Sequence, residues 1–167
     1  SVKNYINQFE ENNFRKKAFK NFKSWPSPLE ETWRLSRLGS LTRKKIKPIN
    51  PNLQKNNNIS PNLIGSIFVK FVDGAYRKDL STEMPSGVDL SVLNNTESLR
   101  YLQKINESNL CNHPSTNISL SCTPSIIKLT VTKNVKVKDF FEITYEGGEN
   151  TESVHPVLYI ELEENSS

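Results

Sequence analysis

The stretch IIKLTVTKNVKVKDFFEITYEGGENTESVHPVLYIEL, residues 126–162, decides the fold class of this chain. It contains three runs rich in β-branched and aromatic residues, at 126–132, 140–145 and 156–162. Asn134 and the pair Gly147-Gly148 lie in the connections between the runs. Short strands about 15 residues apart are typical of a meander or of the successive coils of a parallel β-helix. We therefore expect the last third of the chain to be β structure.

A β-hairpin and a helix are predicted before this region. Residues 63–72 form a β-rich run that ends at Asp73-Gly74, the strongest short hairpin signal, and a second strand is expected over 75–78. We expect a loop over 81–92, because proline and glycine interrupt it. Leucine and isoleucine at helical spacing predict a helix over 97–107.

The N-terminal third is predicted to be helical. Aromatic residues recur at three- and four-residue steps from Tyr5 to Phe22, which predicts one helix that ends near Lys23 with Arg15 and its neighbouring lysines toward solvent. A short second helix is expected across Trp33 and Leu41. The resulting organisation has four parts: a helical region at 1–45, a Pro- and Asn-rich linker at 46–62, a hairpin and helix region at 63–110, and the start of a β core at 111–167.

The composition is sufficient for one modest hydrophobic core. The chain has 167 residues, of which 46 are Leu, Ile, Val or Phe. No stretch approaches the length of apolar sequence that a membrane-spanning helix needs, so we do not expect an integral membrane protein. Two cysteines cannot build a dense disulfide framework, and this favours a reducing compartment, the cytoplasm.

The charge is unevenly distributed. Residues 1–55 carry 13 Lys and Arg against 4 Asp and Glu, whereas the remainder carries 9 against 14. Because the cations alternate with apolar residues, we interpret them as the solvent-exposed face of a helix. A small basic module that binds nucleic acid through these cations, with Trp25 and Trp33 stacking on bases, is the alternative interpretation.

Few residues suggest a metal site or a catalytic centre. Cys111, His113 and Cys122 offer three ligands, whereas a structural zinc site or an iron–sulfur cluster held by one chain usually takes four. Cys111 and His113 could act as nucleophile and base from one face of a strand, but no third group to orient the base is evident. His155 precedes a proline, where a turn-forming or hydrogen-bonding role is expected.

Glu163 and Glu164 are adjacent at the end of the last predicted strand. Neighbouring side chains on a strand point to opposite faces, so we do not expect them to work as a carboxylate pair. The sequence therefore predicts no catalytic residue, no metal ligand and no cofactor-binding residue, and the chain is not expected to be an enzyme.

Four segments, in this order, resemble the N-terminal portion of the SufD family of iron–sulfur cluster assembly proteins. The first combines Phe14-Arg-Lys-Lys-Ala-Phe-Lys-Asn-Phe22, Pro26-Ser-Pro28 and Glu30-Glu-Thr-Trp-Arg34. The second is Phe68-Val-Lys-Phe-Val-Asp-Gly-Ala-Tyr76 with Leu80-Ser81 and Pro85-Ser-Gly-Val88. The third runs from Asn106 to Val131-Thr-Lys-Asn-Val-Lys-Val137, and the fourth is His155-Pro156 with Leu158-Tyr-Ile-Glu-Leu-Glu-Glu164. The hairpin and the Glu-x-Trp-Arg motif favour the SufD branch over the related SufB branch.

The resemblance implies an α+β fold in which N-terminal helices and a β-hairpin lead into the first coils of a right-handed parallel β-helix. It also implies a non-catalytic scaffold subunit that acts with a SufB-like paralogue and a SufC-like ATPase, and a full complex that assembles an iron–sulfur cluster. The family's partner-binding regions lie mostly beyond Ser167, so no functional residue is transferred to this chain. The chain is expected to be the front part of a longer protein, truncated within the β-helix.

Overall fold

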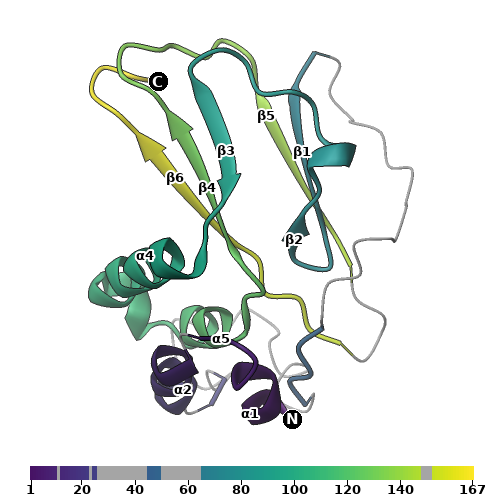
Figure 1. Cartoon of the computed structure of the whole chain (residues 1–167), viewed down its shortest axis with the longest axis vertical. Coiled ribbons are helices and arrows are strands. Elements are labelled where there is room, and N and C mark those ends of the chain that lie inside the picture. The colour runs from purple at the N-terminus through teal and green to yellow at the C-terminus, as the bar shows by residue number, and fades with distance from the viewer. Residues whose placement is uncertain (11, 23, 26–44, 50–64, 148–151) are drawn as a thin grey trace.

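The computed structural model describes residues 1–10, 12–22, 24–25, 45–49, 65–147 and 152–167. This part of the chain is a mixed α+β structure with short helices and two three-stranded sheets. The helices are α1 (Val2–Ile6), α2 (Asn12–Asn21), α4 (Asn95–Glu107) and α5 (Pro114–Cys122), with 3₁₀ turns η2 (Lys78–Leu80) and η3 (Asn109–Asn112). The strands are β1 (Ile67–Val72), β2 (Ala75–Tyr76), β3 (Val88–Val92), β4 (Ile126–Val131), β5 (Phe141–Glu146) and β6 (Val157–Leu162). The sheets lie at one end of the molecule and the helices at the other (Figure 1).

Each sheet combines one antiparallel and one parallel pair of strands. The first has the order β2-β1-β5, and the second has the order β3-β4-β6. Strands β2 and β3 run antiparallel to β1 and β4, whereas β5 and β6 run parallel to them. Since β5 lies between β4 and β6 in sequence, the chain crosses from one sheet to the other and back.

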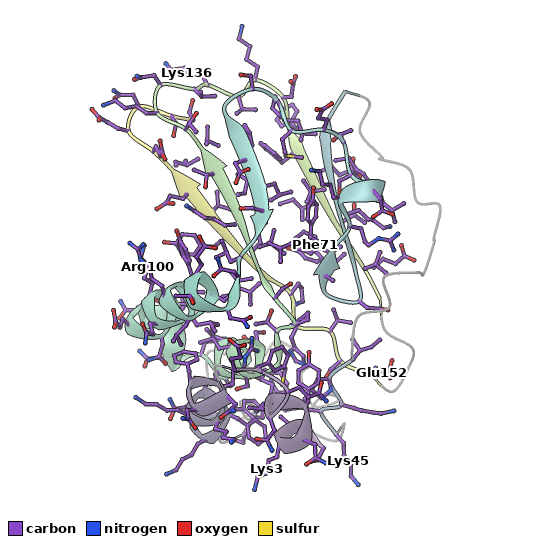
Figure 2. All side chains as sticks on the ribbon, in the orientation of Figure 1. Lys3, Lys45, Phe71, Arg100, Lys136 and Glu152 are labelled. Atoms are coloured by element: carbon purple, nitrogen blue, oxygen red, sulfur yellow. The ribbon has the colours of Figure 1, made fainter. Side chains whose placement is uncertain are left out.

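The two sheets pack face to face around a shared apolar core. Val69 and Phe71 of β1 contact Ile127 of β4, and side chains of the remaining long strands pack around them. The Phe71 side chain is fully buried and points into the space between the sheets (Figure 2). All six residues of β1 are buried, which explains why its sequence is a nearly continuous apolar run without polar alternation.

The predicted hairpin is confirmed. Asp73 and Gly74 have φ angles of 50° and 86°, and β1 pairs with β2 directly across them. Two consecutive positive φ angles form the turn whose twist matches paired strands, and Asp-Gly is the sequence that adopts it most readily. The helix predicted over 97–107 is also confirmed as α4, which begins with a capping box between Asn94 and Glu97.

The prediction of one continuous N-terminal helix is wrong. Helix α1 ends at Ile6, and residues 7–10 form turns before α2 begins at Asn12. Tyr5 of α1 and Phe19 of α2 both pack in the cluster that contains Ile118 of α5. The aromatic spacing that suggests one helix therefore belongs to two. The short helix expected across Trp33 and Leu41, and the linker residues 50–62, lie outside the described residues.

Residues 88–92 were expected to be loop but form strand β3. Val88, Leu90 and Val92 alternate with Asp89 and Ser91, which is the pattern of a half-buried strand, and the segment pairs with β4. The proline and glycine before it favoured the loop interpretation.

Residues 114–122 correct the expectation that the β core starts at Cys111. This segment is α5, which begins after His113 with Pro114 in its first turn. Its polar residues leave no amphipathic pattern in the sequence, yet Ile118, Leu120 and Cys122 are buried. The strands predicted at 126–132, 140–145 and 156–162 are confirmed as β4, β5 and β6, and they begin only after this helix.

The glycine at position 87 is required by its surroundings. Gly87 has a φ angle of +81°, and a Cβ placed there would lie 3.1 Å from Thr132 Oγ1 and would collide with the Val135 side chain. Its carbonyl accepts the Thr132 backbone N–H at 2.9 Å. We expect Gly87→Ala to lower the free energy of unfolding by about 1–3 kcal/mol, because both backbone strain and a steric clash are introduced. Urea denaturation tests this, and Gly65→Ala, where φ is +78° but the site is open, is the control for backbone strain alone.

Candidate interaction surface

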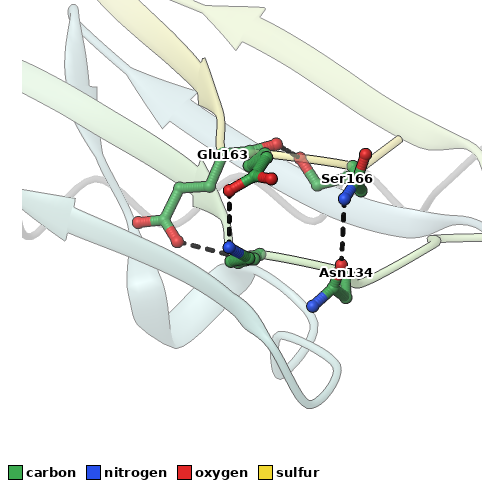
Figure 3. Close-up of polar contacts among 6 residues, drawn as sticks. Asn134, Glu163 and Ser166 are labelled. Carbon is green, nitrogen blue, oxygen red and sulfur yellow. Dashed lines mark hydrogen bonds and ion pairs between the residues drawn. The ribbon is translucent and has the colours of Figure 1, made fainter.

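The turns that follow β4 and β6 are stacked on each other (Figure 3). Asn165 Nδ2 donates to Asn134 Oδ1 at 3.3 Å across a separation of 31 residues. The strands have the same offset, because Ile126 pairs with Val157. Asn134 and Asn165 both have positive φ angles, 64° and 58°, a conformation that asparagine tolerates better than most residues. One structural unit therefore recurs after 31 residues, in backbone conformation as well as in pairing.

Glu163 and Glu164 take part in the same stack and do not point to opposite faces of a strand. They lie beyond the end of β6, in a turn. The Glu163 carboxylate accepts the backbone N–H of Lys133 at 2.9 Å, and the Glu164 carboxylate is 2.5 Å from Lys133 Nζ. Both carboxylates thus hold the second turn onto the first, a structural role.

A groove with a volume of about 470 Å³ lies between β6 and the helices. Five consecutive residues, 156–160, line one wall. Because alternate strand residues point to opposite faces, a wall made of consecutive residues lies along the edge of the strand. The other wall includes Lys104 and Ile105 of α4 and Leu110 of η3, and Leu110 is 63% exposed. The groove is mainly apolar, with Lys104 as the charged residue among those that line it.

The histidines and Cys122 are used in packing and capping. His113 caps α5, since its Nδ1 accepts the Ser115 backbone N–H at 3.3 Å. Cys122 lies at the other end of this nine-residue helix, so roughly 13 Å along the helix axis separates the two residues. Burial raises the pKa of the Cys122 thiol to about 12, although Arg15 nearby acts in the opposite direction, and the thiol is therefore protonated at neutral pH.

Cys111 and His113 do not lie on a strand. Cys111 is part of η3, and His113 follows it as the cap of α5, so the strand geometry considered for a nucleophile and base is wrong. His155 lies before β6, where its Nε2 is 2.9 Å from Ser153 Oγ, in agreement with the expected hydrogen-bonding role. Within the described residues, no cluster of three or more His, Cys, Asp or Glu side chains could hold a metal ion.

The N-terminal cations are not all available to a partner. Arg15, predicted to face solvent, is 1% exposed, and its guanidinium donates to the Thr123 carbonyl at 2.7 Å and lies 3.9 Å from the Phe9 ring centre. Several aromatic side chains of this region, Phe9, Phe19, Phe22 and Trp25, pack against a core formed by α1 and α5. Lys3, Lys16, Lys17 and Lys20 are exposed. These four aromatic residues are thus partly buried in packing, and Trp33 lies outside the described residues.

No protein-family model and no curated protein matches the chain. Among the helices of the described residues, none combines the length and the apolar character needed to cross a bilayer. The candidate interaction surface therefore consists of the stacked turns, the edge of β6 and the groove beside it.

Proposed function

We propose that this chain is a non-catalytic scaffold element of the iron–sulfur cluster assembly machinery, acting with a SufB-like paralogue and a SufC-like ATPase in a cytoplasmic or plastid compartment. In this proposal, the two sheets are the first coils of a right-handed parallel β-helix, preceded by helices and a hairpin. The iron–sulfur cluster is the product of the assembled complex and is not a resident cofactor of this chain.

The observation that carries the proposal is the 31-residue repeat of β4 and its turn in β6 and its turn. In a β-helix each coil stacks on the preceding one with parallel pairing in register, and equivalent turns lie above each other. The parallel pair β1 and β5 supports the same arrangement in the other sheet.

The places of the resembling motifs also support the proposal. The Asp73-Gly74 hairpin contains β1, the strand with which β5 pairs. The Ser81 hydroxyl accepts the Lys70 backbone N–H at 2.9 Å. The Gly87 carbonyl accepts a backbone hydrogen bond from the turn after β4. The hairpin, Ser81 and Gly87 thus each stabilise the first strands or turns of the two sheets.

The proposal is tested by recovering the protein from its own cells. A tag placed on the genomic copy, followed by affinity purification under nuclease treatment and mass spectrometry, should recover the SufB-like and SufC-like proteins together. Recovery of neither protein, while the tagged protein is folded and abundant, would contradict the proposal. Nucleic acid retained without nuclease, in the absence of those proteins, would instead favour the basic-module interpretation, and this retention should weaken steeply with salt.

A further inference from the structure

Positive charge is concentrated at the helical end of the molecule. In the described parts of 1–25 and 45–49, Lys or Arg occupies seven positions, and Glu10 is the one acidic residue. In the described parts of 65–167 the balance is reversed, with nine Lys or Arg against thirteen Asp or Glu. Helices α1 and α2 lie at the helical end, and Lys3 and Lys45 extend from it (Figures 1 and 2). We define the lysine face as the exposed residues Lys3, Lys16, Lys17, Lys20 and Lys45.

The lysines of α2 are not neutralised by neighbouring side chains. Lys16 Nζ donates to Asn12 Oδ1 at 3.3 Å, and neither it nor Lys17 or Lys20 forms an ion pair with a described residue. Lys16 and Lys20 lie on one side of the helix, about 6 Å apart along its axis, where like charges repel. The first turn of α2 contains no acidic residue. These charges do not stabilise α2, which is held by its packing against α5.

Many cations elsewhere in the described chain are paired. Lys70, Arg77, Lys128 and Lys133 each lie 2.5 Å from a carboxylate oxygen. Lys47, which is close in sequence to the lysine face, lies 3.9 Å from a carboxylate oxygen. The lysine face therefore differs from the rest of the described surface, because it gathers several cations that have no carboxylate partner among the described residues.

The chemistry of the lysine face favours an acidic protein as its partner. Phe9, Phe19, Phe22 and Trp25 are partly buried in packing, so they do not offer free rings on which bases could stack. The large apolar side chains that are exposed in the described chain all lie outside 1–25 and 45–49, so none is placed here to enter a bilayer. A contact made by charge alone contributes orientation and association rate more than affinity. Such a contact suits a protein that is held in the same assembly by another interface.

We infer that the lysine face docks against an acidic surface of a protein partner. The matching surface carries carboxylates about 6 Å apart, as at positions i and i+4 of a helix, opposite Lys16 and Lys20. The lysine face acts within the proposed scaffold assembly, on whose existence this inference rests. The contact uses the helical end of the molecule and none of the sheet edges.

Cross-linking of the complex purified from its own cells through the tagged protein tests the contact directly. A carbodiimide joins a lysine amine to a carboxylate that touches it, without a spacer. We expect peptides that contain Lys16, Lys17 or Lys20 to be joined to an acidic peptide of the SufB-like or SufC-like protein. Lys78 and Lys136 are also exposed and are the matched controls, which should give no such product.

Charge reversal tests whether the contact contributes to assembly. In Lys16→Glu/Lys17→Glu/Lys20→Glu, the association rate with the partners eluted from the native complex should fall about tenfold or more. Glutamate and lysine have similar helix propensities, so α2 should stay folded, and urea unfolding checks this. The triple Lys→Arg variant keeps the charges and should keep the native rate. The native rate should fall between about 0.1 M and 1 M salt, because the screening length shortens from about 10 Å to about 3 Å.

A second charge reversal distinguishes the lysine face from net charge. Lys78→Glu/Arg100→Glu/Lys136→Glu makes the same change in net charge at exposed positions elsewhere and should keep the native association rate. An equal fall in this variant would overturn the inference, as would a native rate in the α2 variant or the absence of the cross-link.

The native protein separates this inference from the proposed function. If it recovers both partners and the lysine face gives no cross-link, the inference fails and the proposed function stands. If it recovers neither partner, the proposed function fails and the inference with it. Nucleic acid that is retained by the native protein and lost by the α2 variant, with partner association unchanged, would overturn the inference in favour of a phosphate backbone as the ligand.

Discussion

Replacing Lys70 by Met should lower the free energy of unfolding by about 3–5 kcal/mol, because the substitution leaves a carboxylate without its partner in a largely buried site. Lys70 is fully buried on β1, and its Nζ lies 2.5 Å from Glu146 Oε2 at the end of β5. Apart from this ionic contact, neither atom has a hydrogen-bond partner among the described residues. Each charge therefore depends on the other for compensation.

Two further variants make this prediction specific. The double variant Lys70→Met/Glu146→Leu should recover most of the lost stability, since a buried ion pair replaced by apolar groups is often neutral. Lys133→Met breaks an ion pair of the same length, 2.5 Å, but both side chains are more than half exposed, so the loss should stay below about 1 kcal/mol. Urea unfolding of the four proteins gives the comparison. Equal losses for Lys70→Met and Lys133→Met would contradict the interpretation, as would a double variant no more stable than Lys70→Met.

Acidification from pH 6.5 to pH 4 should destabilise the protein by about 3 kcal/mol through His155 alone. Burial lowers the pKa of His155 from 6.5 to about 4, and the side chain is only 9% exposed. Between these two values the unfolded chain binds a proton that the folded protein does not bind. Stability is therefore complete above pH 6.5, falls as the pH drops through this window, and changes no further through this group below pH 4.

The comparison of His155→Leu with the native protein isolates this contribution. The variant should show a much flatter dependence of unfolding free energy on pH between 6.5 and 4, measured by urea denaturation at each pH. Asp79 and Glu161, whose pKa values are lowered by ion pairs with Arg77 and Lys128, are present in both proteins and cancel in the difference. Val157→Ala, which removes apolar packing but no titratable group, should lower the whole curve and preserve its slope. A native slope retained in His155→Leu would contradict the prediction.

The elements that could be predicted are those with a strong local signal. The β-branched runs of β4, β5 and β6 favour strands wherever they are placed, and Asp73-Gly74 favours its turn without help from the rest of the chain. Helix α4 has regular apolar spacing and a capping box.

The elements that could not be predicted depend on contacts between distant residues. Helix α5 is buried by α1 and α2 although its own sequence is polar. The sequence predicts that Arg15 is solvated. In the structure its guanidinium is buried and donates a hydrogen bond to the Thr123 carbonyl, at the C-terminal end of α5. No local pattern contains this information.

The positions of most strands, of the hairpin turn and of one helix can therefore be predicted from the sequence, since these elements follow from backbone preferences over a few residues. Three features are evident only in the folded chain: β5 pairs with β1 and not with β4 or β6, Asn134 and Asn165 stack, and no other described strand pairs with the outer edge of β6. Except for the hairpin pair β1 and β2, strand partners are chosen by burial and hydrogen bonding between segments 31 or more residues apart, as in β4 with β6, and these energies are absent from any short stretch of sequence.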